Sequence, residues 1–301
     1  MKISVLTPTY NRGQLLKRLY NSLEKNNNYG IEIEWLIMDD GSTDNSKQII
    51  ENFEKNNITI KYYSQKNQGK MKALNELTKY ATGELIIECD SDDYLTDDAF
   101  KIIKEEYNKN IENKEEAYAL CFLKYDTNGE NIGKKFNKKI TTMFDLYFKD
   151  GENGEKALVF YSKIRKQYRH QLEHNERFIT EARMYHQMDK KYKMICINKP
   201  IMICEYQKDG YTNNIKKQFI ENPYGYYEYF KEIFEQNIKN ISFKKRMYVI
   251  KHFILFTYLT QKRNAIKDVK GMYNKILYIL LYVPGIIKSK VNFNEKSIWQ
   301  Q

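Results

Sequence analysis

Short apolar runs alternate with segments of helical periodicity over the first 125 residues of the chain. A run of about four to eight apolar residues predicts a buried strand, and apolar residues three or four positions apart predict one face of a helix. The expected strands are residues 3–6, 31–38, 58–63, 85–89 and 118–123, and the expected helices are 14–24, 44–53, 70–80 and 97–107. This alternation predicts an α/β fold with a largely parallel sheet and helices on both of its faces.

The regular alternation ends after this point. Asn128-Gly129 lies between two segments that could be strands, so we expect a hairpin there that adds antiparallel strands to the sheet. Residues 156–206 predict another strand, short helices, and two strands on either side of Lys199-Pro200. From Phe219 onward the periodicity is helical and rich in aromatic residues.

The charge is unevenly distributed and suggests a domain boundary. The chain carries a formal charge of +11, and residues 206–301 hold 17 basic side chains against 7 acidic ones, whereas residues 1–205 are almost balanced. Together with a turn expected at Asp209-Gly210, this shift predicts one domain over residues 1–210 and a basic, aromatic helical region over residues 211–301. Lysine greatly outnumbers arginine and no recognition motif is present, so we expect no nucleic-acid partner.

Composition places the chain among globular proteins. With 42% hydrophobic and 30% charged residues in 301, it is not a disordered, collagen-like or polytopic membrane protein. Its four cysteines form no CxxC pair, which favours reduced thiols over disulfides or a zinc site. The apolar run at residues 3–6 is too short for a secretory signal, so a cytoplasmic location is expected.

Three aspartates, Asp90, Asp92 and Asp93, directly follow the expected strand 85–89. Carboxylates this close repel each other unless a cation shares them. Carboxylate oxygens suit Mg²⁺ or Mn²⁺, and Mg²⁺ commonly completes its coordination with phosphate oxygens and water. The loop therefore predicts a metal-bridged diphosphate, and an Asp-rich turn that caps the next helix is the structural alternative.

Two other loops follow expected strands, where parallel sheets bind their ligands. The segment Asp39-Asp40-Gly41-Ser42-Thr43-Asp44 offers a carboxylate for a nucleotide base or a ribose, although helix capping alone also explains it. The segment Thr7-Pro8-Thr9-Tyr10-Asn11-Arg12 offers an aromatic face for a base and a cation for phosphate.

In this order the motifs resemble those of family 2 glycosyltransferases. The resemblance covers about residues 1–125 and rests on Ser4 to Arg12, Asp39 to Asp44, Asn67-Gln68-Gly69 with Ala73-Leu74-Asn75, and Ala81-Thr82-Gly83-Glu84 leading into Asp90-Ser91-Asp92-Asp93. It implies a GT-A fold, which is Rossmann-like with a mostly parallel central sheet and helices on both faces, here followed by a C-terminal helical segment. It also implies a nucleotide-sugar donor, a divalent Mn or Mg ion, and inversion at the anomeric carbon.

The resemblance further implies roles for single residues. Residues 1–125 would form the nucleotide-sugar-binding half and residues 126–210 the acceptor half. The implied donor-binding residues are Pro8, Thr9, Tyr10, Arg12, Asp39 (base), Lys70, Lys72, Asp90 (ribose) and Ser91. Asp92 would bind the metal, and Asp93 would contact the sugar or lie behind the metal ligands.

The segment 176–182 resembles the acceptor-side segment of the family, whose acidic residue deprotonates the acceptor hydroxyl. Glu181 is therefore the implied catalytic base. The chain has Glu181-Ala182 in place of the commoner Glu-Asp pair, and the nearby Glu173 and Glu176 stay open as alternatives.

Two apolar stretches in the C-terminal region, residues 247–258 and 276–287, are shorter than the roughly 20 residues that a membrane span needs. They fit either helices packed on the catalytic domain or peripheral contact with the inner face of the cell membrane. The second interpretation would suit an acceptor that is a lipid-linked glycan.

The sequence thus predicts an inverting, metal-dependent glycosyltransferase that moves a sugar from a nucleotide sugar, with UDP-sugars favoured, to a glycan or lipid-linked glycan in surface polysaccharide synthesis. One alternative is a non-catalytic nucleotide-sugar-binding partner of an assembly. Another is a nucleotidyltransferase, which would usually carry a Gly-rich phosphate loop after the first strand, where this chain has no glycine until Gly13.

Overall fold

A nine-stranded sheet forms the centre of the computed structural model, which describes residues 1–26, 29–54, 57–113, 115–208, 210–211, 213–236 and 238–292. The strand order is β3-β2-β1-β4-β8-β6-β9-β5, with β7 paired to β9. The strands are β1 (Lys2–Thr9), β2 (Glu32–Asp39), β3 (Ile58–Ser64), β4 (Leu85–Glu88), β5 (Tyr94–Leu95), β6 (Ala117–Tyr125), β7 (Ile140–Thr141), β8 (Lys156–Tyr161) and β9 (Lys193–Ile203). Strands β1 to β4 run parallel, as the alternating pattern predicts.

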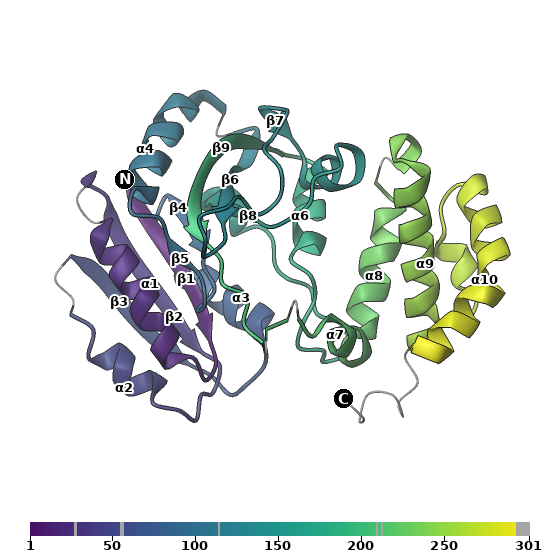
Figure 1. The fold of residues 1–301 in the computed structure, drawn as a ribbon, viewed down its shortest axis with the longest axis horizontal. Helices are drawn as coiled ribbons and strands as arrows, with labels where there is room; N and C mark the ends of the chain where they lie inside the picture. Colours follow the sequence, from purple (N-terminus) through teal and green to yellow (C-terminus); the bar gives the residue numbers. More distant parts are fainter. Residues whose placement is uncertain are drawn as a thin grey trace.

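Helices cover both faces of this sheet (Figure 1). The helices of the α/β part are α1 (Gly13–Lys25), α2 (Ser46–Glu51), α3 (Lys70–Tyr80), α4 (Ala99–Lys109), α5 (Ser162–Arg165) and α6 (Ala182–Asp189), with short turns at Ile111–Asn113 and Asp145–Lys149. One apolar core packs Trp35 of β2 with residues of α1, α2 and α4 such as Ile103. A second core contains Leu77 of α3 and Met188 of α6. This is the expected mixed α/β architecture with a mostly parallel sheet.

The expected hairpin at Asn128-Gly129 forms a tight turn but adds no paired strand. The carboxylate of Asp126 accepts hydrogen bonds from two turn amides, and beyond the turn only an isolated bridge joins Tyr125 to Asn131. The antiparallel strand is instead β8, which inserts between β4 and β6. The prediction of a hairpin strand at this point was therefore wrong, because the pairing partner of β6 comes from later in the chain.

The two strands expected around Lys199-Pro200 are one continuous strand, β9. Its pairing with β6 shifts register between Phe122, which faces Ile197, and Leu123, which faces Pro200. A bulge of this kind accommodates the missing amide hydrogen of proline without ending the strand.

A buried carboxylate fixes the first strands in register. Glu34 on β2 is fully buried and accepts hydrogen bonds from the Ser4 hydroxyl and from the amide and hydroxyl of Thr82. These bonds hold the pKa of Glu34 below its ordinary value although burial opposes this. A side chain at Gly83 would begin 2.7 Å from the Ser4 nitrogen, so the Thr82-Gly83 motif serves this close packing of β1.

The C-terminal region is a layer of helices beside the α/β part: α7 (Ile215–Glu221), α8 (Pro223–Ile233), α9 (Phe243–Leu259) and α10 (Met272–Asn292), with short turns at Ile238–Asn240 and Ala265–Asp268. In Figure 1, α9 lies between α8 and α10. A third apolar core joins this layer to the α/β part, since Phe148 and Ile179 pack with Phe230 and Phe253. The boundary expected near residue 210 stays a prediction, and Asp209 of its turn lies outside the described residues.

The two apolar stretches of this region have different environments. In α9 the residues Val249, Ile250, Phe253, Ile254 and Phe256 are buried. In α10 much of the apolar surface is exposed to solvent. Among the described helices, none is both long and apolar enough to cross a bilayer.

Candidate active site

The carboxyl ends of β1, β2 and β4 meet at one edge of the sheet, and a cleft of about 1360 Å³ opens there. Its wall includes residues from 1–125, the expected donor half, and from 126–210, the expected acceptor half. Of the residues expected at the site, Pro8, Thr9, Tyr10, Arg12, Lys70, Asp90, Ser91, Asp92, Asp93 and Glu181 line it. The tertiary structure thus brings together residues that are up to about 170 positions apart in the sequence.

Each aspartate of the Asp90 to Asp93 loop contacts a different cation. The Lys70 ammonium donates to Asp90 over 2.6 Å, the Arg12 guanidinium donates to Asp92 over 2.5 Å, and Lys124 donates to Asp93 over 2.8 Å. These side-chain cations offset much of the repulsion among the three carboxylates, and that repulsion was one reason to predict a metal ion. The loop is a real charge cluster, but the repulsion alone does not require a metal ion.

The chemistry of Asp90 and Asp92 nevertheless fits a divalent ion. Both line the cleft with carboxylate oxygens, the ligands that Mg²⁺ and Mn²⁺ prefer. Burial and the charge of Asp90 raise the pKa of Asp92 above its ordinary value even though Arg12 opposes this. Arg12 thus does not fully offset the effects of burial and of Asp90 on the pKa of Asp92.

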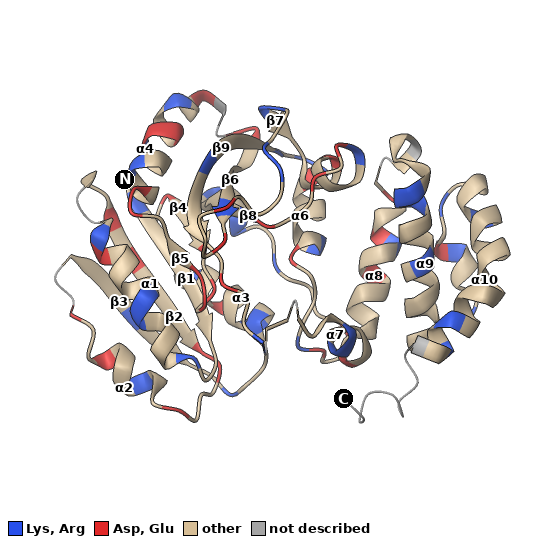
Figure 2. Cartoon of the chain, in the orientation of Figure 1, with Lys and Arg blue, Asp and Glu red and all other residues tan. Residues whose placement is uncertain are grey.

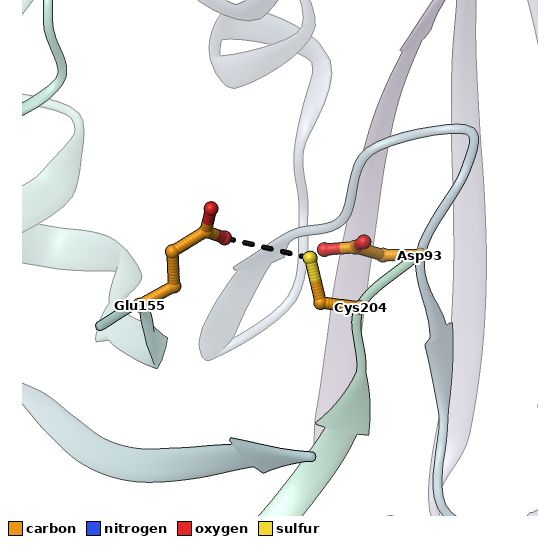
Figure 3. A group of neighbouring side chains, drawn as sticks. All are labelled: Asp93, Glu155 and Cys204. Carbon is orange, nitrogen blue, oxygen red and sulfur yellow. Dashed lines mark hydrogen bonds between the residues drawn. The ribbon is translucent and has the colours of Figure 1, made fainter. Parts of the chain in front are cut away.

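A second group of possible ligands lies deeper, at Asp93, Glu155 and Cys204 (Figure 3). The Lys124 ammonium lies 2.8 Å from Asp93 and 3.1 Å from Glu155, so a cation is already present in this group. Burial raises the pKa of the Cys204 thiol, which keeps it protonated and a poor metal ligand. The group therefore fits a metal less well than Asp90 and Asp92 do.

Asp39 and Lys72 lie outside the cleft wall formed by the described residues. The Asp39 carboxylate accepts hydrogen bonds from the Ser42 amide over 2.7 Å and from the Tyr62 hydroxyl over 3.0 Å, so in this structure it orders the turn. The Lys72 ammonium donates to the Gln68 side chain over 3.5 Å. The donor-binding roles of Asp39 and Lys72 stay predictions.

The neighbouring Asp40 orders the next loop of the site. Its carboxylate accepts hydrogen bonds from the amides of Gln68 and Gly69, at 2.8 and 2.7 Å. Gly69 has a φ of 94°, and a side chain there would begin 2.2 Å from the carbonyl oxygen of Arg177. Only glycine allows this loop to touch the backbone of the acceptor-side segment.

Lys70 connects the donor loop to the acceptor side. Its ammonium lies 2.6 Å from Asp90 and 2.9 Å from Glu181, which directly precedes α6. Although burial opposes a charge on either group, this pairing raises the pKa of Lys70 and lowers the pKa of Glu181. Glu181 is therefore an ionised carboxylate beside the donor-side aspartates.

The two alternative acids have structural partners. Glu176 accepts hydrogen bonds from the amides of Tyr224 and Gly225 at the start of α8, and burial raises its pKa to about 7. Glu173 pairs with Arg183 at 3.0 Å. Of the three acids, Glu181 is the one paired with the donor-side lysine.

Several residues of the site were not identified from the sequence. Lys124 is the next-to-last residue of the apolar strand β6, and a single lysine in such a run is a signal that could have indicated it. Arg165 is fully buried and donates to Glu88, immediately before the aspartate loop, over 2.7 Å. Nothing in the sequence around Arg165 indicates this contact, because it joins positions 77 residues apart.

Two relatives found by sequence comparison are both named as sugar transferases. An uncharacterized glycosyltransferase of Mycoplasma genitalium is 34% identical over 146 residues, which are 47% of this chain and 46% of the relative. A GalNAc(5)-diNAcBac-PP-undecaprenol beta-1,3-glucosyltransferase of Campylobacter jejuni is 26% identical over 75% of this chain and 72% of its own length. The chain thus spans about half of the first of these relatives.

The fold is also found in solved structures. The crystal structure of residues 1–349 of Staphylococcus aureus TarS in complex with UDP-GlcNAc superposes with a TM-score of 0.59 and 19% identity, covering 97% of this chain and 80% of that one. The model of Glycosyl transferase family 2 matches residues 4–153. These residues include the aspartate loop and most of the described residues on the expected donor side of the cleft. The chain therefore belongs to glycosyltransferase family 2.

Proposed function

We propose that this protein transfers a sugar from a nucleotide sugar to an acceptor hydroxyl with inversion at the anomeric carbon. The observation that carries the proposal is the contact of Lys70 with both Asp90 and Glu181. The contact supports this proposal because it holds the Glu181 carboxylate beside an ammonium that also binds Asp90 of the aspartate loop. An inverting displacement needs a base on the face of the sugar opposite to the leaving diphosphate.

In the proposed reaction, Glu181 accepts the proton of the acceptor hydroxyl. The acceptor oxygen forms a bond to the anomeric carbon while the bond from that carbon to the diphosphate oxygen breaks, and the electron pair leaves with the nucleoside diphosphate. Lys70 and Arg12 line the same cleft and supply positive charge toward the phosphates. No covalent intermediate with the protein is required.

Asp92 would hold a divalent metal ion, Mn²⁺ or Mg²⁺, and Asp90 beside it would bind the ribose of the donor. When bound, such an ion would neutralise part of the negative charge on the leaving diphosphate. The Asp93 carboxylate accepts a hydrogen bond from Lys124. In the proposed complex, Asp93 either lies behind the metal ligand or contacts the sugar.

A UDP-sugar is the proposed donor, and the hydroxyl of a glycan or lipid-linked glycan in surface polysaccharide synthesis is the proposed acceptor. The UDP-GlcNAc complex of the TarS structure supports the first part. The name of the Campylobacter relative, which states an undecaprenol-linked glycan, supports the second. The sugar transferred is expected to be a hexose or an N-acetylhexosamine.

The first test is donor binding by the full chain. Thermal unfolding is followed with UDP, GDP and CDP and with their sugar conjugates, with Mn²⁺ and with chelator, for wild type and Asp92→Asn. A ligand that binds the native state raises the melting temperature by mass action. We expect a shift with UDP or a UDP-sugar that requires both the metal and Asp92.

The second test separates a transferase from a binding protein. Glu181→Gln should bind the UDP-sugar as wild type does and lose about 10²- to 10⁴-fold in the rate of transfer or of donor hydrolysis. Glu235→Gln, a surface glutamate paired with Lys190 at 3.1 Å, is the matched control and should keep the wild-type rate. Equal rates for Glu181→Gln and wild type would reject Glu181 as the base, and donor binding without turnover would favour the non-catalytic alternative.

A further inference from the structure

The outward surface of α10 is a continuous apolar face on an otherwise well-packed layer of helices. Six of its exposed residues, Met272, Ile276, Leu280, Val283, Ile287 and Val291, recur three or four positions apart and form what we call the α10 face. Leu280 is 67% exposed and Val283 is 64% exposed. Isolated exposed apolar residues are common, but a stripe of them along 20 residues marks an interaction surface.

The charges around the α10 face are almost all positive. Residues 260–292 contain seven lysines and arginines and one acidic residue, Asp268. The Asp268 carboxylate accepts a hydrogen bond from the Tyr227 hydroxyl over 2.6 Å, so it is engaged with α8. Figure 2 accordingly shows blue segments and no red ones along α10.

A groove beside the α10 face adds a second observation. Its volume is about 1240 Å³, and apolar side chains such as Ile266, Tyr278 and Val283 line it together with Lys262 and Arg263. These two cations lie in a tight loop whose flanking residues, Gln261 and Asn264, have φ values of 53° and 57°. A left-handed conformation at two residues other than glycine is uncommon. Here the two residues between them, Lys262 and Arg263, are exposed and form part of the groove lining.

We propose that the α10 face and this groove bind the surface of an anionic phospholipid bilayer. Apolar side chains with a cationic surround match the acyl region and the negative headgroups of such a bilayer. A second copy of the chain is a poorer match, because pairing two α10 faces would also bring their lysines together. The helix would lie on the membrane and not across it.

This placement has a consequence for the proposed acceptor. Because α8 and α9 lie between α10 and the α/β part (Figure 1), a bilayer on the outer side of α10 would be separated by these two helices from the α/β part, which carries most of the cleft residues. A lipid-linked acceptor would then reach the cleft with its glycan end. The inference deepens the proposed function only in this respect, and the test below contains no donor, so failure of either proposal leaves the other intact.

The test is co-sedimentation of the full chain with vesicles of phosphatidylcholine alone and of phosphatidylcholine with 30% phosphatidylglycerol, a composition chosen at about the anionic content that attracts basic segments. Wild type should bind the anionic vesicles, and binding should weaken as salt rises. Leu280→Gln/Val283→Gln should weaken binding at least about tenfold, since it removes apolar contact with the acyl region. Lys288→Gln/Lys290→Gln should weaken it about three- to tenfold and reduce its salt dependence.

The matched control is Ile140→Gln, because Ile140 is 46% exposed on β7 in the α/β part. This variant should bind vesicles as wild type does, and all variants should keep the wild-type melting temperature. The proposal is overturned if wild type ignores anionic vesicles, if it binds phosphatidylcholine equally well, or if the Leu280→Gln/Val283→Gln variant binds unchanged. It is also overturned if analytical ultracentrifugation finds a wild-type dimer that these two substitutions dissociate, which would assign the face to a second copy.

Discussion

The cleft and the α10 face depart from the usual distribution of side chains in opposite ways. In the cleft, the carboxylates of Asp92, Asp93 and Glu181 lie largely out of water and are held by cations. On α10, many apolar side chains lie in solvent, although α9 beside it buries most of its own. Both arrangements cost folding stability, so each identifies a surface that stability alone does not explain.

The strongest test of the cleft removes one of its cations. Lys124→Met would leave Asp93 buried without its partner, and we expect a loss of about 3–5 kcal/mol in the free energy of unfolding at neutral pH. Denaturant unfolding measures this loss. The double variant Lys124→Met/Asp93→Asn removes both charges and should recover most of it, and a double variant as unstable as the single one would show that packing, and not charge, determines the effect.

The buried helix beside α10 gives the next largest effect. Ile250→Ala on α9 should lower the free energy of unfolding by about 3 kcal/mol, because it removes fully buried methyl groups and leaves a cavity. The same unfolding experiment applies. A loss below about 1 kcal/mol would mean that α9 packs less tightly than its burial indicates.

A buried carboxylate without a cation gives a different, pH-dependent signature. Asp189 accepts hydrogen bonds from the amides of Met143 and Phe144 and from the Tyr118 hydroxyl, and burial raises its pKa to about 7. Between about pH 4 and pH 7 the folded state keeps a proton that the unfolded state has lost. Stability contributed by Asp189 should therefore fall as the pH rises, by up to about 1.4 kcal/mol per pH unit.

Unfolding measured across this pH range for wild type and Asp189→Asn tests the assignment. The difference between the two stability curves should slope with pH over this window and become flat below it. Parallel curves throughout would show that Asp189 is ionised in the folded protein.

The smallest effect is expected on the α10 face. Leu280→Ala should change the free energy of unfolding by less than about 0.5 kcal/mol, because the side chain is already in solvent. A loss comparable to that of Ile250→Ala would show that a partner covers α10 in solution. Repeating the measurement at several protein concentrations identifies whether that partner is a second copy.

The first four strands and their loops could be predicted because each apolar run ends in a polar motif. The pairing of the later strands could not be predicted, since it is not local. β8 pairs with both β4 and β6, and its partner residues on β4 lie more than 70 positions earlier in the chain. The Asn128-Gly129 signal was correct for a turn, but a turn does not determine which strand pairs beyond it.

The candidate site shows the same limit. The aspartate loop was identified because its three carboxylates are adjacent in sequence, whereas their cations Arg12, Lys70 and Lys124 come from three separate elements. The part of the metal prediction that rested on repulsion left out cations that only the fold brings near. In the same way, α9 and α10 have similar apolar stretches, and only the packing of the layer determines which one is buried.

The contact between Gly69 and the Arg177 carbonyl limits how this protein can be redesigned. Two segments with different proposed tasks, one following β3 on the proposed donor side and one preceding Glu181, share a backbone surface that has no room for a side chain. An exchange of donor-side loops between relatives would have to carry the matching acceptor-side segment with it. Donor and acceptor preference are therefore expected to change as one unit when such chains diverge.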